Sequence, residues 1–410
     1  MNLTKKRWMI LAACCFINLC IGSLYAWSVF AAPMAAHLQA LSGGEAPNLA
    51  VIFTIANGVG PVTMISGGAL QGKLGPRRVI LLGGLLFGLG MFFSGFATSV
   101  SVLLLTYGLG VGLGVGMVYG CTVSHCVKFF PDRRGLIGGI ATASYGISSV
   151  VVPLLANALI SRFSVTAAFR VLGLAMLAVI GLCALAVIPC PAGFVPEGWE
   201  PPHTAGGSTA AVKDHTWREM LASPAFYAML LMLCCGAFSG LMITSQAAQI
   251  AQRMVGMTAA EAAAVVSVLA LFNTFGRILA GFLSDRLGAV NTILGVFLVS
   301  IAGLLLLYCS GPGAVGSFYA GVCIVGLCFG SIMGIYPGFT AARFGSRYNG
   351  VNYGIMFIGF AAAGCLGPMI MSGIYGSTGA YQPAFLLAAL LAAAGCGLNG
   401  VCRMFGWGKE

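Results

Sequence analysis

The sequence predicts an all-α polytopic membrane protein whose twelve transmembrane helices form two pseudo-symmetric six-helix bundles. Three observations support this fold class. Hydrophobic residues make up 59% of the 410-residue chain and charged residues only 7%, whereas a soluble protein carries about 25% charged residues. Apolar runs of membrane-spanning length recur along the whole chain, and a glycine-rich motif that follows the second run returns after the eighth.

The apolar runs define the spans in chain order. Each run is long enough to cross a hydrocarbon core about 30 Å thick as a helix. The predicted spans are residues 8–32, 48–71, 79–97, 101–126, 135–160, 166–189, 223–250, 259–283, 290–309, 314–338, 350–375 and 380–403. The first run follows three cations as a signal peptide would, but its length and the many later spans predict a first transmembrane helix.

The longest polar interval, residues 190–220, divides the spans six and six. We therefore expect an N-terminal six-helix bundle over residues 1–189, a central cytoplasmic loop over 190–220, and a C-terminal six-helix bundle over 221–410.

The distribution of cations predicts the orientation. The net charge of +11 comes from twenty lysines and arginines in short clusters between apolar runs, a pattern typical of membrane topology rather than of nucleic-acid binding. With a cytoplasmic N-terminus, sixteen cations face the cytoplasm and only Arg162, Arg170 and Arg253 face the other side. We expect an integral protein of a bacterial inner (plasma) membrane with both termini cytoplasmic.

The cysteines and histidines do not indicate a metal or redox site. Most of the fifteen cysteines lie inside apolar runs, where they act as small hydrophobic residues. Cys121, His125 and Cys126 superficially resemble metal ligands, but a single histidine at one helix end is a weak pattern. We expect neither a metal nor a cofactor.

The twentieth cation, Arg277, lies within a span. It precedes Asp285 by eight positions, which places it roughly 12 Å inside the hydrocarbon. All nine acidic residues lie in loops, tails or helix ends, and no span carries a carboxylate at depth. We expect the Arg277 guanidinium to have no internal partner, so that water or a bound anion satisfies it. The alternative is that it snorkels to water or donates to backbone carbonyls.

Hydrogen-bonding side chains lie at a comparable depth. Asn273 precedes Arg277 by one helical turn on the same face, and Tyr25, Tyr119 and Tyr145 lie in spans 1, 4 and 5. A phenol tolerates an apolar wall and can donate to a carboxylate, although core packing explains any single tyrosine equally well. We expect these residues to contact an anionic substrate.

The repeated motif carries a resemblance to a known family. Residues 68–75 and 281–288 share the form Gly-x-Leu-x-x-basic-Leu-Gly, 213 residues apart. This resembles the loop signature of the major facilitator superfamily and implies a two-bundle secondary transporter with its substrate site midway between the halves. The resemblance also implies a lock at the cytoplasmic helix ends, made by Gly68, Gly75, Arg77, Asp132, Arg133, Asp285 and Arg286. Gly72 replaces the usual acid of the first copy, so the first lock is expected to be weaker; otherwise both loops are simply tight, solvated turns.

Further segments resemble one branch of that superfamily, the oxalate/formate antiporter family, which is close to the monocarboxylate transporters. They are residues 23–27 (Ser-Leu-Tyr-Ala-Trp), 129–136 (Phe-Phe-Pro-Asp-Arg-Arg-Gly-Leu), 143–146 (Ala-Ser-Tyr-Gly), 276–277 (Gly-Arg) and 352–354 (Asn-Tyr-Gly). The resemblance implies that Arg277 binds the carboxylate and that Tyr25, Tyr119 and Tyr145 belong to an aromatic cage around the substrate.

One departure from that family narrows the expected substrate. Phe360 stands where the oxalate exchanger has a second intramembrane cation, and Phe329 and Met333 make the wall of span 10 less polar. One arginine neutralises one carboxylate, so we expect a small monocarboxylate such as pyruvate, lactate or formate.

The expected function is transport of that anion by alternating access, coupled either to an exchanged carboxylate or to a co-transported proton. We expect a functional monomer in the lipid bilayer that binds no nucleic acid. The alternatives are a dicarboxylate (oxalate-type) exchanger, another solute or drug carrier of the same fold, and a non-transporting sensor. A membrane enzyme is disfavoured because no histidine lies at depth.

Overall fold

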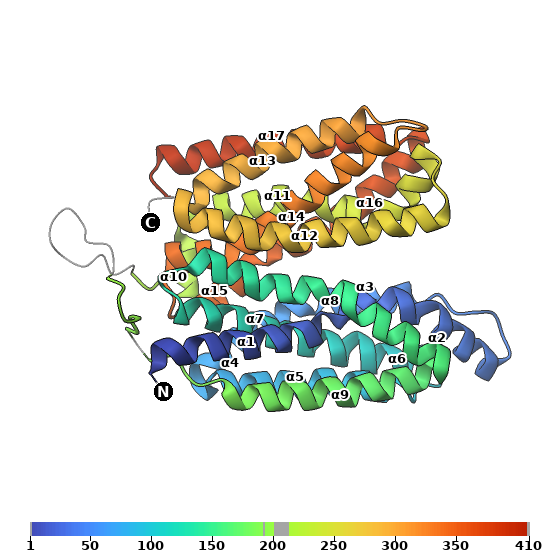
Figure 1. The fold of residues 1–410 in the computed structure, drawn as a ribbon, viewed down its shortest axis with the longest axis horizontal. Helices are drawn as coiled ribbons and strands as arrows, with labels where there is room; N and C mark the ends of the chain where they lie inside the picture. Colours follow the sequence, from blue (N-terminus) through green and yellow to red (C-terminus); the bar gives the residue numbers. More distant parts are fainter. Residues whose placement is uncertain (1, 192, 201–212, 408–410) are drawn as a thin grey trace. The chain divides into compact units, whose positions relative to one another are not determined.

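The computed structural model describes residues 2–191, 193–200 and 213–407, and this part of the chain consists of helices and the loops that join them (Figure 1). Part of the predicted central loop, residues 192 and 201–212, lies outside the described residues. The terminal positions 1 and 408–410 do so as well.

Twelve helical segments are long and apolar enough to cross a membrane, and each corresponds to one predicted span, which confirms the fold class. The first six comprise α1 (Leu3–Ile21), η1 (Gly22–Ala26) and α2 (Trp27–Ser42); α3 (Ala50–Gly58) and α4 (Gly60–Leu74); α5 (Pro76–Ser94); α6 (Val100–Leu103), η2 (Leu104–Val111) and α7 (Gly112–Phe129); α8 (Arg134–Arg162); and α9 (Val165–Ala186). The short α10 (Trp217–Ala222) precedes the second six. These comprise α11 (Pro224–Ile250) with η3 (Ala251–Val255), α12 (Ala259–Leu287), α13 (Ala289–Tyr308), α14 (Val315–Phe344), α15 (Asn349–Met356) with α16 (Ile358–Thr378), and α17 (Gln382–Met404).

The two signature loops end in equivalent turns. Gly75 and Gly288 have φ angles of 79° and 81°, in the region that disfavours a side chain. Each glycine ends one helix and begins the next, so the motif forms a sharp corner between consecutive spans.

The packing divides the chain into two compact units. Unit 1 comprises Met1–Asp132, Ser144–Ala210 and Arg347–Ile355, and unit 2 comprises Arg133–Ala143, Ala211–Ser346 and Met356–Glu410. Two short pieces depart from a division of the chain into halves: Arg133–Ala143 is grouped with unit 2 and Arg347–Ile355 with unit 1. The expected domain limits, residues 1–189, 190–220 and 221–410, stay a prediction.

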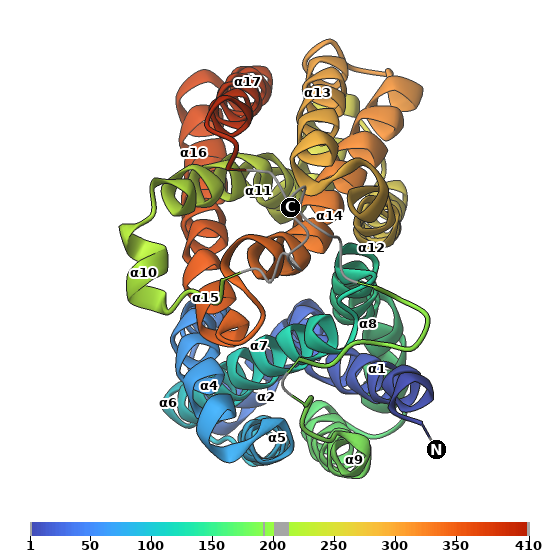
Figure 2. The ribbon, with the colours of Figure 1, turned by 90° about the vertical axis from the view of Figure 1, so that its left-hand side faces the viewer.

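In unit 1, α5 packs against α7 and α9, and α1 against α7 and α9 (Figure 2). A buried ion pair ties the start of α1 to the loop that follows α7. The Arg7 guanidinium donates to both carboxylate oxygens of Asp132, at 2.6 and 3.0 Å, and lies 4.4 Å from the centre of the Phe130 ring. Asp132, expected to act in a lock, is thus partnered within unit 1.

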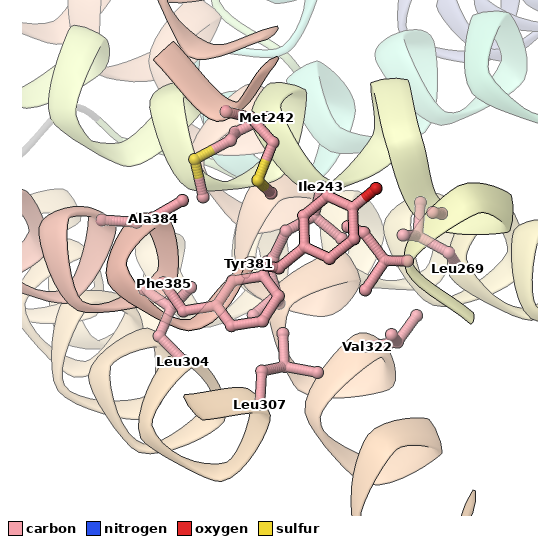
Figure 3. Close-up of a cluster of buried hydrophobic side chains, with 14 of the residues drawn as sticks. Met242, Ile243, Leu269, Leu304, Leu307, Val322, Tyr381, Ala384 and Phe385 are labelled. Carbon is pink, nitrogen blue, oxygen red and sulfur yellow. The ribbon is translucent and has the colours of Figure 1, made fainter. Parts of the chain in front are cut away.

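In unit 2, a hydrophobic cluster joins α11, η3, α12, α13, α14, α16 and α17, and Figure 3 draws part of it. Its labelled members are Met242, Ile243, Leu269, Leu304, Leu307, Val322, Tyr381, Ala384 and Phe385. Tyr381 immediately precedes α17 and is only 2% exposed, so the start of that helix is anchored in the cluster.

Glycines on α14 bring its backbone against that of α12. Gly326, Gly330 and Gly334 follow one another every fourth residue and so share one face of α14. A Cβ atom at these positions would meet, in turn, the carbonyl oxygens of residues 269, 273 and 277. The contact needs residues without side chains, as in close helix pairs of other membrane proteins.

We predict that Gly330→Ala destabilises the protein. The added methyl would overlap the Asn273 carbonyl oxygen and force the two helices apart, at a cost of about 1–3 kcal/mol. Gly316→Ala, on the same helix but with no atom within 4 Å of the new Cβ, is the matched control and should be neutral or slightly stabilising. Thermal unfolding in detergent, followed with a thiol-reactive dye that detects the buried cysteines, measures both; equal unfolding temperatures would contradict the prediction.

Candidate functional site

Arg277 lies on α12 with its side chain buried, at 4% exposure. Its guanidinium donates to neutral acceptors from two elements of unit 2. Nη1 donates to the backbone carbonyl of Thr142 on α8 at 2.8 Å, while Nε and Nη2 donate to Oδ1 of Asn273 at 3.2 and 3.1 Å. The expectation that Arg277 lacks any internal partner is therefore wrong, because a carbonyl of a neighbouring helix and a side-chain amide both reach it.

These three bonds leave the charge uncompensated. Within the described residues Arg277 forms no ion pair, and its acceptors are dipoles rather than anions. One N–H on each terminal nitrogen is left over, because each of these nitrogens carries two hydrogens and donates once. These two N–H groups can donate to the oxygens of an anion such as a carboxylate.

Asn273 offers a further donor beside the arginine. Its side chain is 8% exposed, and its amide oxygen is held by Arg277, which fixes the orientation of the amide. The other end, Nδ2, makes no hydrogen bond to any described residue. A buried donor of this kind normally has a partner, so an acceptor is expected there when substrate is bound.

The backbone of Arg277 is enclosed by glycines from two helices. A Cβ atom at Gly139 of α8 or at Gly334 of α14 would overlap the carbonyl oxygen of Arg277. Both helices therefore contact the main chain of α12 at Arg277 itself, and these contacts fix the position of its Cα atom.

The three predicted tyrosines gather in unit 1. Tyr145 of α8 lies between the other two, with ring centres 5.4 Å from Tyr25 of η1 and 4.9 Å from Tyr119 of α7. Gly22 allows this approach, because a Cβ there would overlap the carbonyl oxygen of Tyr145. The structure thus forms one tyrosine cluster from spans 1, 4 and 5, and its contact with substrate stays a prediction.

Phe360 belongs to an aromatic stack in unit 2. Its ring lies 6.3 Å from Phe329 of α14, nearly parallel, and 4.5 Å from Phe357. Position 360, which the sequence analysis singled out as lacking a second cation, is therefore part of an aromatic stack.

The second signature loop caps a helix. The carboxylate of Asp285 accepts the backbone N–H groups of Gly135 and Leu136, at 2.7 and 2.8 Å, in the first turn of α8. A negative charge satisfies the free N–H groups of a helix N-terminus and interacts favourably with its dipole. Arg286 lies 4.3 Å from the centre of the Phe282 ring, and Arg133 is exposed.

The first signature loop makes a similar backbone contact without the acid. Gly68 lies against the backbone of Gly350 at the start of α15, as Gly281 lies against Gly135. At Gly72, a Cβ would meet nothing within 4 Å. The two copies therefore differ in the carboxylate, as expected; Arg77 of this copy is exposed, and the locking role of both copies stays a prediction.

Three contacts escaped the sequence analysis. At the site, the Thr142 carbonyl has no side-chain signature; in unit 1, away from Arg277 along the chain, the Arg7–Asp132 pair joins residues 125 positions apart. The glycines of α14, in contrast, carry a readable signal in their four-residue spacing.

Twelve helical segments that could cross a membrane and a buried cation describe an integral membrane protein. Comparison with known proteins gives its family and, with the family, its class: a transporter rather than an enzyme. The family model of the Major Facilitator Superfamily matches residues 11–368. The chain belongs to the Major Facilitator Superfamily.

Curated relatives span nearly the whole chain. The chain is 29% identical over 359 residues to the uncharacterized MFS-type transporter YhjX of Escherichia coli (strain K12), covering 88% of this chain and 86% of that protein. It is 28% identical over 396 residues to the oxalate:formate antiporter of Oxalobacter formigenes, covering 95% and 90%. It is 24% identical over 406 residues to human monocarboxylate transporter 12, covering 93% and 77%.

Solved structures share the fold. The transporter FucP in its outward conformation aligns with a TM-score of 0.72 at 15% identity, over 97% of this chain and 99% of that one. At this identity the similarity concerns the fold alone.

We predict that Asp285→Ala lowers the unfolding temperature, because the first N–H groups of α8 lose their acceptors, at a cost of about 0.5–2 kcal/mol. Asp285→Asn keeps one acceptor oxygen without the charge and should lie between the alanine variant and wild type. The dye-based unfolding assay described above measures the series. An alanine variant as stable as wild type would show that the cap contributes nothing.

Proposed function

We propose that the protein transports small monocarboxylates by alternating access and that Arg277 binds the carboxylate. The observation that carries this proposal is a buried guanidinium whose only acceptors among the described residues are neutral. A guanidinium stays charged at any physiological pH, so burial cannot neutralise it.

The energetics favour an anionic substrate. Burying an ion without a counter-charge costs several kcal/mol even after local relaxation. The Asn273 and Thr142 oxygens offset part of this cost through hydrogen bonds, but they bring no negative charge. A substrate carboxylate would supply that charge and accept the two remaining N–H groups of Arg277, and its polar substituent could accept from Asn273 Nδ2.

The charge count favours one carboxylate. Phe360 lies in an aromatic stack, where a dianion would need a second cation. The relatives named for oxalate:formate antiport and for monocarboxylate transport support small carboxylates as the substrate class. As the family resemblance implies, Tyr25, Tyr119 and Tyr145 then donate to the substrate.

The same electrostatics favour exchange. A bound carboxylate neutralises Arg277 and lowers the cost of closing apolar helices around it, so the loaded carrier changes conformation more readily than the empty one. In the proposed cycle both termini are cytoplasmic, and the signature-loop residues stabilise the closed cytoplasmic ends. Trans-stimulation by internal carboxylate, without an effect of a pH gradient, distinguishes exchange from proton symport in vesicles.

A dicarboxylate exchanger is the second candidate, because the oxalate:formate antiporter is among the relatives at 28% identity. The two candidates differ in what they require at position 360, because a dicarboxylate would need a second cation there.

We predict that Arg277→Gln and Arg277→Lys each lower pyruvate counterflow into pyruvate-loaded proteoliposomes by at least about 100-fold. Glutamine removes the charge, and lysine cannot form the bidentate pair while also bonding Asn273 and Thr142. Arg218→Gln, in the exposed α10, is the control for loss of a cation and should transport normally. A folded Arg277→Gln variant that transports at the wild-type rate would rule out the proposed role.

We predict that Phe360→Lys raises the ratio of oxalate to pyruvate transport by about tenfold or more, because the second cation compensates the second carboxylate. Phe360→Met removes the ring without adding charge and should leave the ratio unchanged. If wild type already carries oxalate better than pyruvate, the dicarboxylate candidate is correct.

A further inference from the structure

The end of span 7 exposes only polar side chains. Over residues 241–255, at the end of α11 and in η3, every hydrophobic residue is buried or half-buried. The exposed residues of this segment are Thr244, Ser245, Gln249, Gln252 and Arg253.

This pattern differs from that of a lipid-facing helix. Surfaces of α9 and α13 expose residues such as Leu182 and Leu298, at 69% and 56%. Ser245, Gln249 and Gln252 recur at helical spacing and so form a stripe along one side of the helix, about 10 Å long. Polar groups and a charge are costly in contact with hydrocarbon, so this stripe faces water.

Arg253 is held in place at the end of the stripe. Its guanidinium lies 5.3 Å from the centre of the Tyr375 ring, and that ring stacks on Tyr381 at 4.3 Å. Tyr381 belongs to the buried cluster of Figure 3, so the platform beneath Arg253 is anchored in the core of unit 2. A cation–π contact positions the guanidinium and leaves its charge in place.

The nearby acid does not neutralise this arginine. Glu261, in the first turn of the next helix, accepts hydrogen bonds from the backbone and hydroxyl of Thr258 at 2.8 and 2.9 Å. Within the described part of the chain Arg253 forms no ion pair. Its charge is therefore available to an anion from water.

Arg253 is well separated from Arg277. Arg277 follows the N-cap residue Thr258 by 19 positions, or roughly 28 Å along α12. The two cations therefore cannot hold one small carboxylate together.

We propose that Arg253, with Gln249 and Gln252, forms a second anion-binding site that captures carboxylates from water on the side opposite the termini, before they reach Arg277. The proposal rests on the proposed function and orientation. The amide side chains supply donors beside the cation, and the polar stripe continues from it along α11 to Ser245. Next to this stripe, Gln246 donates to Ser372 of α16 at 2.7 Å, which adds a polar contact between these two helices.

A capture site on an exposed cation has a definite kinetic signature. It raises the local concentration of anions, so its loss raises KM and leaves the maximal rate unchanged. Salt weakens it, because the Debye length falls from about 30 Å at 0.01 M to about 8 Å at 0.15 M.

The experiment measures pyruvate uptake by oriented proteoliposomes at low and high ionic strength. We expect Arg253→Gln to raise KM by about threefold to tenfold at low salt on the Arg253 side only, and the increase should shrink at high salt. Arg253→Lys keeps the charge and should stay near wild type. Arg162→Gln removes an exposed cation predicted to lie on the same side, and it should leave KM unchanged.

Three results would overturn the inference: an unchanged KM in Arg253→Gln, an equal change in Arg162→Gln, or an Arg253→Lys variant as impaired as Arg253→Gln. The last result would assign Arg253 to packing on Tyr375. The proposed function fails separately, when wild type itself takes up no carboxylate, and the capture site then fails with it.

Discussion

A permanent positive charge inside an apolar helical unit is the constraint on which the rest of this structure depends. Arg277 is almost completely removed from solvent, and its guanidinium cannot lose its proton. The surrounding helices supply oxygen atoms without charge, so the site is hydrogen-bonded and electrostatically incomplete. Under the proposed function, this combination allows the empty carrier to fold and leaves the charge of Arg277 for the substrate to neutralise.

The beginning of α8 connects this charge with the second signature loop. Within unit 2 the segment 133–143 meets α12 twice, where Asp285 caps its first turn and where Thr142 accepts from Arg277. On α12 the two contacts are made by Arg277 and, eight residues later, by Asp285. On α8 the order is reversed, since the contact with Asp285 comes before the contact of Thr142 with Arg277. The capped turn and an acceptor of the guanidinium thus belong to one short helical segment.

The sequence predicts the parts of this protein that depend on local composition. The twelve spans follow from hydrophobicity over helical length, and the Asn273–Arg277 bond follows from the spacing of one turn. The sequence identifies the three tyrosines but does not predict their ring contacts, because three separate helical segments bring them together. The Thr142 carbonyl and the Arg7–Asp132 pair could not be predicted, because a backbone acceptor leaves no side-chain signal and because the paired residues lie in different helix-end clusters.

The close contacts around the main chain of Arg277 have a consequence for how such a protein changes over evolution. Gly139 and Gly334 both press on its carbonyl oxygen, so the cation cannot be moved by small shifts of either helix. Under the proposed function, a change of cargo would then be reached more easily by substitution of side chains such as Phe329 and Phe360 than by displacement of the arginine. The two glycines would constrain the evolution of such a carrier through the backbone, without any contact with the cargo.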